Sequence, residues 1–425
     1  MLVLALLPAG ATEWLVLHDA VVIDGRGNPP RSVAALVIRD GIVSDIDPVQ
    51  IQTEVLDSVT HIDLGGRTVI PGLIDSHVHL SGYPGDRAGI EQRMQQALRG
   101  GVTSVRDMAG DTRALADAER AMARDEFIGL TVAYSALFGG PSMFDDPRIS
   151  LASVGHEPGN APWAQAIEAD TDLVRAVAAA RATGATGIKI YGNLDAGLIT
   201  DITAEVHRQG MQAWAHSTVF PAGPVDLLDA GVDVLSHAPY LVWAAAPSIP
   251  DDYGARREGD YAAIDPEHPR IRRLLKRMAK EQVPIDTTLL IYRDAIQQAE
   301  GDAGSWATAA FAWGTTVVGL AHELGVPIAA GTDRFTPDDW SLPDLHEELV
   351  VLVEESGLTP LEAITAATWN SARAAGLQSS RGSIETGKAA DLVVLDADPV
   401  TDIRATQQIV MVFKDGKLVH ARNEQ

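Results

Sequence analysis

The sequence of 425 residues contains no cysteine, which excludes disulfide bonds, thiolate metal sites and a cysteine nucleophile. Basic residues are also few, with 33 Lys and Arg against 58 Asp and Glu and a formal net charge of -25. A surface of this charge repels phosphate backbones and anionic lipid, so we expect neither nucleic acid nor membrane as a partner. Any metal ion must be held by histidine and carboxylate side chains.

Long apolar runs are scarce as well. The N-terminal run MLVLALLPAG is far shorter than the roughly 20 residues that span a bilayer. Ala9-Gly10-Ala11 resembles the cleavage site of a signal peptide, but the positively charged start of such a peptide is missing. Residues 1–11 are therefore either a clipped export signal or an ordinary apolar leader, and both a cytoplasmic and an exported location stay open.

Both ends of the chain read as β-structure. Short apolar runs from Trp14 to Val69 are broken at Asp40-Gly41, and similar runs near the C-terminus are broken at Asp415-Gly416. Asp-Gly between apolar runs is a strong hairpin signal. Because neither end has enough strands to bury a face alone, we expect residues 12–70 and 379–425 to form one small β-sandwich.

The middle of the chain, residues 71–378, alternates short apolar strands with amphipathic helices. This alternation of strands and helices is typical of an α/β fold of the (β/α)₈ TIM barrel type. The expected strands number about eight: GLIDSHVH, VTSVRDM, LTVAYSALF, GIKIYGN, MQAWAHS, VDVLSHAPY, VPIDTTLLIY and VPIAAGTD. Residues 139–166 and 241–269 are too long for ordinary loops, and we expect them either to select the substrate or to form surface structure or a subunit contact.

Histidines recur at the ends of the predicted strands. His77 and His79 lie two residues apart, so they project from the same face of one strand and can reach the same ion. His216, His237 and Asp333 end three later strands. A pair of this kind also occurs for packing or hydrogen bonding, but the carboxyl ends of barrel strands converge in space. As a set, these side chains predict a metal site.

Lys189 lies inside the apolar strand GIKIY, where a bare ammonium would cost several kcal/mol to desolvate. One explanation is a side chain that reaches water at the strand end or pairs with an acid. The other is that burial lowers its pKa, so that the neutral amine is available for chemistry or modification.

Several motifs together resemble the amidohydrolase superfamily. They are PGLIDSHVH at the first barrel strand, IKIY at the fourth, AHS and SHAP at the fifth and sixth, and GTD at the eighth, with DLGGRTVIPG and IETGKAADLVVLD in the flanking regions. The similarity extends over nearly the whole chain. It is greatest to the imidazolonepropionase-like and Xaa-Pro dipeptidase-like branch, although LFGGPSMFDDPR stands where the dipeptidases carry a Gly-Gly-His-Gly pattern.

The resemblance implies a metal-dependent hydrolase that cleaves an amide, cyclic amide or dipeptide C–N bond of a small-molecule substrate with a water activated by two divalent ions. The expected metal is Zn²⁺, and Asp333 would be the catalytic base. The implied ligands are His77, His79 and Asp333 for one ion, His216 and His237 for the other, and a carboxylated Lys189 that bridges both.

Three residues directly follow or lie near these positions and are expected substrate contacts: Tyr191, Tyr240 and Arg334, the last able to pair with a substrate carboxylate. Structural roles for the three stay open. Two other enzyme activities also stay open, a mononuclear deaminase with a structural Lys189 and a lactonase. A non-catalytic assembly protein fits less well because every expected ligand position is filled. Assembly into a homo-oligomer is left undecided.

Overall fold

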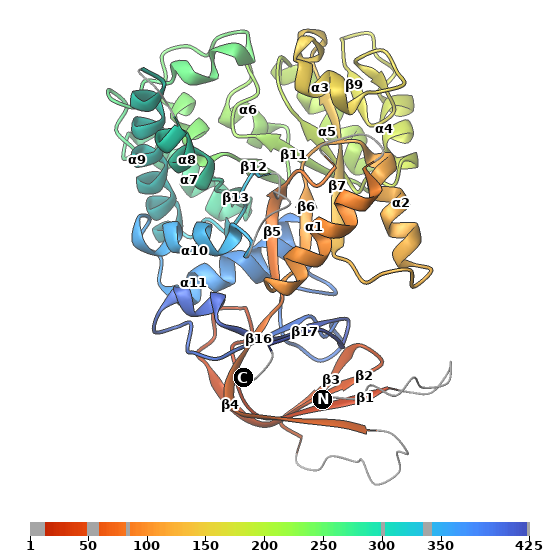
Figure 1. The fold of residues 1–425 in the computed structure, drawn as a ribbon. Helices are drawn as coiled ribbons and strands as arrows, with labels where there is room; N and C mark the ends of the chain where they lie inside the picture. The colour runs from red at the N-terminus through yellow and green to blue at the C-terminus, as the bar shows by residue number, and fades with distance from the viewer. Residues whose placement is uncertain (1–12, 49–58, 82–85, 299–301, 335–341, 423–425) are drawn as a thin grey trace.

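The computed structural model describes residues 13–48, 59–81, 86–298, 302–334 and 342–422. A barrel of β-strands surrounded by helices forms one part of the molecule, and a β-sheet built from both chain ends lies beneath it (Figure 1). The expectation for residues 1–11 lies outside the described residues. Within the described ranges, no helix is long and apolar enough to cross a membrane.

Eight parallel strands form the barrel, and each overlaps a segment that the sequence predicts. They are β5 (Leu73–Val78), β6 (Val102–Asp107), β7 (Thr131–Gly139), β10 (Gly187–Ile190), β11 (Gln212–His216), β12 (Val234–Ser236), β13 (Ile285–Asp286) and β14 (Ile328–Ala329). The last strand returns to the first, because the Ser76 amide donates to the carbonyl of Ala330 at 2.9 Å. The predicted TIM barrel is therefore confirmed.

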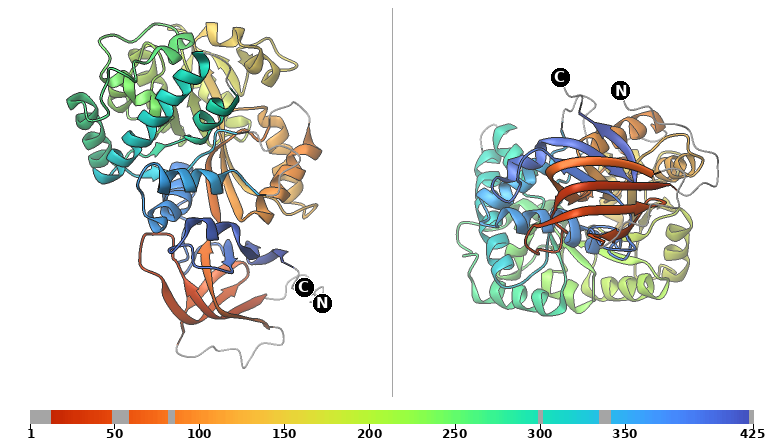
Figure 2. Two further views of the ribbon diagram at one scale, coloured as in Figure 1. Left: turned by 60° about the vertical axis from the view of Figure 1, so that its left-hand side comes forward. Right: turned by 90° about the horizontal axis from the view of Figure 1, so that it is seen from below.

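Helices cover the outside of the barrel (Figures 1 and 2). The sequence of α7 shows why such segments are helical, since its buried residues Ile271, Leu274, Leu275 and Met278 follow the spacing of one helix face. The helices are α1 (Arg87–Arg99), α2 (Thr112–Met122), α4 (Leu173–Ala182), α5 (Ala196–Arg208), α6 (Pro224–Asp229), α7 (Pro269–Glu281), α8 (Leu290–Gln298), α9 (Asp302–Glu323), α10 (Leu345–Glu354), α11 (Pro360–Thr365) and α12 (Ser371–Ala374).

The two chain ends pair with each other, as predicted, and the expected small β-sandwich takes the form of one seven-stranded mixed sheet. Its order is β17-β16-β15-β4-β1-β2-β3, with β1 (Trp14–Val22), β2 (Arg31–Arg39), β3 (Ile42–Ile46), β4 (Val59–Pro71), β15 (Leu392–Leu395), β16 (Ile409–Lys414) and β17 (Lys417–Ala421). Both predicted hairpins form. Asp40 and Gly41 have φ angles of 49° and 79°, and Asp415 and Gly416 have 48° and 72°, as a tight turn with two left-handed residues requires.

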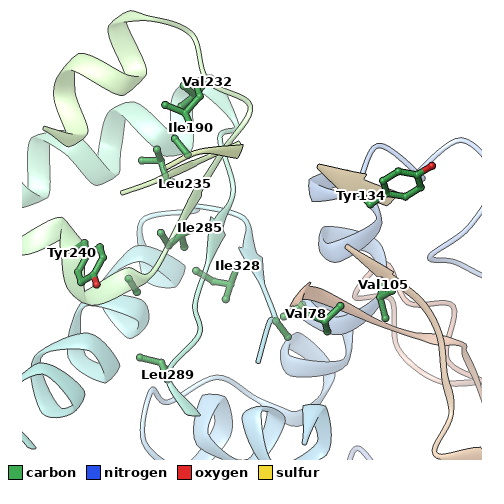
Figure 3. Packing of buried hydrophobic residues seen from close by; sticks show 14 of the residues in the cluster. Val78, Val105, Tyr134, Ile190, Val232, Leu235, Tyr240, Ile285, Leu289 and Ile328 are labelled. Atoms are coloured by element: carbon green, nitrogen blue, oxygen red, sulfur yellow. The ribbon is translucent and has the colours of Figure 1, made fainter. Parts of the chain in front are cut away.

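The sheet lies across one end of the barrel, as the view from below shows (Figure 2). Strand β4 ends at Pro71 and β5 begins at Leu73, so this is the end where the barrel strands start. Each part has a core of its own. The barrel part is packed with buried side chains such as Ile285 and Ile328, which are register partners on β13 and β14 (Figure 3). The carboxyl ends of the strands lie at the far end from the sheet.

Two long segments fold over that far end. The first forms η1 (Pro141–Asp145), α3 (Pro147–Ala152), β8 (Asn160–Ala161) and β9 (Ala164–Ala166), and the second forms η2 (Ala238–Ala244) and η3 (Tyr253–Glu258). They correspond to the two regions that are too long for ordinary loops. Both contribute side chains to the cavity described below.

Candidate active site

Four histidines and an aspartate from four strand ends lie together at the carboxyl end of the barrel. The ring centroids of His77 and His237 are 4.9 Å apart, and those of His216 and His237 are 4.7 Å apart. His237 and Asp333 have φ angles of 69° and 54°. Such left-handed backbone is uncommon outside glycine and persists where the surrounding structure enforces it, which is frequent at functional sites.

Each of the four imidazole rings is held through its Nδ1 atom. The Nδ1 partners are Asp286 Oδ2 for His77 at 2.6 Å, the Ala109 carbonyl for His79 at 3.0 Å, the Tyr191 carbonyl for His216 at 2.7 Å and Thr288 Oγ1 for His237 at 2.8 Å. Holding Nδ1 fixes the ring and leaves Nε2 as the atom that can bind another group. This arrangement is the usual one around histidines that bind metal ions.

Three of these residues form a group that could hold one metal ion. The ligand atoms of His77, His79 and Asp333 all lie within 4.8 Å of one another. Asp333 Oδ1 is 2.9 Å from His79 Nε2 and 3.3 Å from His77 Nε2. Two imidazoles and a carboxylate that converge in this way suit Zn²⁺ or a similar divalent ion.

Burial sets the charge of most of these side chains. It lowers the pKa of His77 and His216, and lowers the pKa of His237 to about 3, so these rings are neutral at physiological pH. Burial acts in the same direction on His79, but the hydrogen bond and the negative charge of Asp333 prevail and raise the pKa of that ring. Neutral imidazole is the form that binds metal.

Lys189 is fully buried on β10, and its Nζ atom has no hydrogen-bond partner in the part of the chain that the structure describes. Burial, helped by the nearby positive charge of Arg106, lowers the pKa of Lys189 to about 7. The explanation by a path to water or a paired acid therefore fails for this side chain. An amine that is buried, unpaired and partly neutral is a group that modification or a nearby ion would satisfy.

These residues therefore fit a divalent metal centre. The inward Nε2 atoms, the carboxylate of Asp333 and the orphaned amine of Lys189 form one donor set, and all of them line one cavity of about 350 Å³. His216 and His237, which lie outside the three-residue group, contact each other on the Lys189 side of the cavity.

Of the three predicted substrate contacts, two line the cavity and one does not. The rings of Tyr191 and Tyr240 face it. Arg334 is instead bound to the carboxylates of Asp294 and Asp344 and is absent from the cavity wall. Its charge is therefore already neutralised by the protein.

Several site residues were not predicted from the sequence. Asp286 ends β13 and holds His77, and Thr288 lies two residues later and holds His237, roles that their position at a strand end could have suggested. Tyr253 and Arg256 belong to the second long segment. Tyr292 lies at the start of α8. For the last three, the sequence offers no signal beyond the length of the segment or the proximity of a strand.

The sequence is similar to known proteins along nearly its whole length. The Amidohydrolase family matches residues 68–419. Imidazolonepropionase from Salmonella arizonae is 27% identical, over 94% of this chain and 95% of the relative. Ochratoxinase from Aspergillus niger is also 27% identical, over 95% of this chain and 86% of the relative.

Solved structures share the fold. A crystal structure of A. niger ochratoxinase matches with a TM-score of 0.75 and 24% identity, covering 97% of this chain and 96% of the other. A Xaa-Pro dipeptidase with bound methionine in the active site matches with a TM-score of 0.73 and 23% identity, covering 95% of this chain and 99% of the other. At this level of identity the likeness concerns the fold.

Proposed function

The chain belongs to the amidohydrolase family and is a hydrolase of C–N bonds; from this premise we propose that it cleaves an amide bond of a small molecule at a centre of two divalent ions. One observation carries the proposal. Four imidazoles held through Nδ1, one carboxylate and one buried amine without a partner converge in a single cavity. A site that only packed the core would leave no such amine unpaired.

In this proposal His77, His79 and Asp333 would hold one ion and His216 and His237 would hold the other. Lys189 would be a ligand of both as its carbamate, formed when the neutral amine adds carbon dioxide and loses a proton. The histidine-rich donor set suits Zn²⁺. When bound, such ions supply Lewis-acid polarisation of a carbonyl and a water of lowered pKa. The carbamate would also replace an isolated buried cation with an anion between two cations, which removes the desolvation cost of Lys189.

Asp333 is the proposed catalytic base. Its neighbours His77, His79 and His237 overcome the effect of burial and hold its pKa far below the usual range, so it is a carboxylate. It accepts a proton from the attacking water as the water oxygen adds to the carbonyl carbon. It returns that proton to the nitrogen when the C–N bond breaks, which yields an acid and an amine.

Tyr240 is a proposed contact for the substrate carbonyl or the leaving group. Burial keeps the pKa of Tyr240 well above its usual value, so its hydroxyl stays protonated and can donate a hydrogen bond. Tyr191, whose carbonyl holds His216, presents its ring to the same cavity and would limit the position of the substrate.

Metal analysis combined with a substrate screen tests the proposal. We expect about two ions per chain and hydrolysis of at least one compound among N-acyl amino acids, dipeptides and cyclic amides. Hydrolysis of lactones alone would favour a lactonase instead. Lys189→Ala should lose at least one ion and most activity, with partial recovery in short carboxylic acids that replace the carbamate. Lys276→Ala, an exposed lysine on α7, is the control.

A fully active Lys189→Ala protein with one ion would overturn the two-ion proposal. One ion in the natural chain together with ammonia release from an aminated ring would favour a deaminase instead.

A further inference from the structure

The cavity wall carries an uneven distribution of charge. Apart from the proposed ligands, its only charged side chains among the described residues are Arg256 and Arg257, both on η3. Carboxylates outnumber basic groups widely in this chain, and arginines such as Arg277 and Arg404 pair with them. Neither Arg256 nor Arg257 has a carboxylate within 4.0 Å among the residues that the structure describes.

Aromatic rings, rather than acids, position the two arginines. The guanidinium of Arg256 lies 4.5 Å from the centre of the Tyr253 ring and donates to the Tyr253 carbonyl at 3.3 Å. The guanidinium of Arg257 lies 5.1 Å from the centre of the Trp306 ring. Stacking on a ring fixes the plane of a guanidinium while leaving most of its N–H donors free for a ligand.

Tyr253 lies between Arg256 and the proposed metal centre and contacts both. Its ring stacks on that of His216, with centroids 5.2 Å apart and an interplanar angle of 11°, and the same ring carries Arg256. One aromatic ring therefore separates the guanidinium of Arg256 from a proposed metal ligand. A substrate whose reacting carbonyl lies at the centre can reach Arg256 with a group only a few bonds away.

The space between these two points is aromatic. The buried rings of Tyr240, Tyr253 and Tyr292 line this space. The indole N–H of Trp306 on this wall is buried without a partner among the described residues. Such a surface favours an aromatic or branched apolar group over a charged one.

We infer that the site selects a substrate with a carboxylate beside an aromatic or branched apolar group, Arg256 and Arg257 binding the carboxylate; this inference rests on the proposed function. The class that meets these requirements is an N-acylated aromatic or branched amino acid, cleaved at its acyl C–N bond. Arginine is suited to this role because its planar N–H pairs match both oxygens of a carboxylate. Arg334, already neutralised by two acids, takes no part.

Two compounds that differ only in the carboxylate test the inference. N-acetyl-L-phenylalanine carries it and N-acetyl-2-phenylethylamine lacks it. With the metal-loaded enzyme we expect kcat/KM to favour the acid by about 10- to 100-fold, as for hydrogen bonds to a charged group. In the double variant Arg256→Met, Arg257→Met this ratio should fall towards one, and the corresponding pair of lysine substitutions should keep part of it.

A matched control is the double variant Arg270→Met, Arg273→Met, which removes two exposed arginines of α7 outside the cavity and should keep the ratio. Equal kcat/KM for both compounds, or an unchanged ratio in the Arg256 and Arg257 double variant, would overturn the inference. If neither compound is cleaved, the proposed reaction fails for this class. Calorimetric binding of both compounds to the metal-loaded protein then decides the inference by the same ratio.

Discussion

The proposed ligands depend on side chains one hydrogen bond further out, and Asp286 is the strongest case. It is fully buried, and its Oδ2 accepts from His77 Nδ1 at 2.6 Å and from Arg106 at 2.9 Å. Burial would raise its pKa, but the hydrogen bond from His77 and the charge of Arg106 contribute to an opposing effect that prevails and lowers it, so Asp286 is a carboxylate. A negative partner of this kind orients the ring and makes its Nε2 a stronger donor to metal.

Asp286→Asn should therefore weaken metal binding by about 10- to 100-fold. The asparagine keeps the size of the side chain but loses the charge that orients His77. Competition with a chelator of known affinity measures the change. Asp233→Asn is the matched control, because Asp233 also contacts a histidine, His207, at 2.9 Å but on the exposed surface. Equal affinities for the Asp286→Asn and natural proteins would contradict the prediction.

How far the sequence predicts single site residues depends on what positions them. His77 and His79 could be placed together because the two-residue repeat of a strand is local. Arg334 could not be placed, since its partners Asp294 and Asp344 come from other segments and the pairing exists only in three dimensions. For the same reason the sequence could not place Arg256 on Tyr253 within a segment that has no repeat.

At the scale of elements, α10 fixes the loop that follows β13. Glu348 of α10 is fully buried and accepts from Thr287 Oγ1 at 2.6 Å, the Leu289 amide at 3.1 Å and the Leu290 amide at 2.8 Å. The loop held in this way carries Thr288, which bonds His237. A helix outside the barrel therefore positions a proposed ligand through one carboxyl group.

Glu348→Gln should lower the free energy of unfolding by about 1–3 kcal/mol at pH 5, because its amide N–H₂ would face the Leu290 N–H. Burial raises the pKa of Glu348 from its ordinary 4.5 to about 7, against the opposing hydrogen bonds. The folded state thus keeps a proton that the unfolded state loses between these pH values. The free energy of unfolding of the natural protein should therefore exceed that of the variant by less and less as pH rises through this window.

Urea unfolding at pH 5 and pH 8 measures this difference in the free energy of unfolding. Glu347→Gln, the neighbouring position on α10, is the control. Glu347 is exposed and pairs with Arg293 on the surface, so its loss should cost less than about 1 kcal/mol. A stability difference that grows with pH would contradict a pKa of Glu348 raised by folding.

Among helices and strands, too, the features with a local signal could be predicted from the sequence, and long-range pairing could not. Each barrel strand lies where an apolar run with turn residues on either side predicts it, and both Asp-Gly hairpins form, because these signals lie within a few residues. The parallel pairing of β1 with β4 could not be read from the sequence. It depends on a crossover between distant segments, for which local sequence carries no register.

At the scale of the whole molecule, the proposed centre links strands from all around the barrel. Its side chains come from β5, from β10 to β12 and from the turn after β14. Because an ion binds the folded chain and not the separated strands, it stabilises the fold in proportion to its affinity. Removal of metal with EDTA should lower Tm by several degrees, and Zn²⁺ should restore it.

Differential scanning calorimetry measures this change in Tm. In the double variant His77→Ala, His79→Ala the response to EDTA should be reduced. The response should be kept in His18→Ala, a histidine of the sheet that contacts His61 far from the barrel centre. An identical response in the natural protein and the His77 and His79 double variant would place the stabilising metal elsewhere.

The sheet built from both chain ends can be completed only after the C-terminal strands have been synthesised. Strand β4 lies between β1 from the same end and β15, which is made more than 300 residues later. While the ribosome is still translating the barrel, one edge of β4 has no neighbour and offers free backbone groups to other chains. We expect nascent chains to need protection at this edge, and any product that stops before β15 to aggregate.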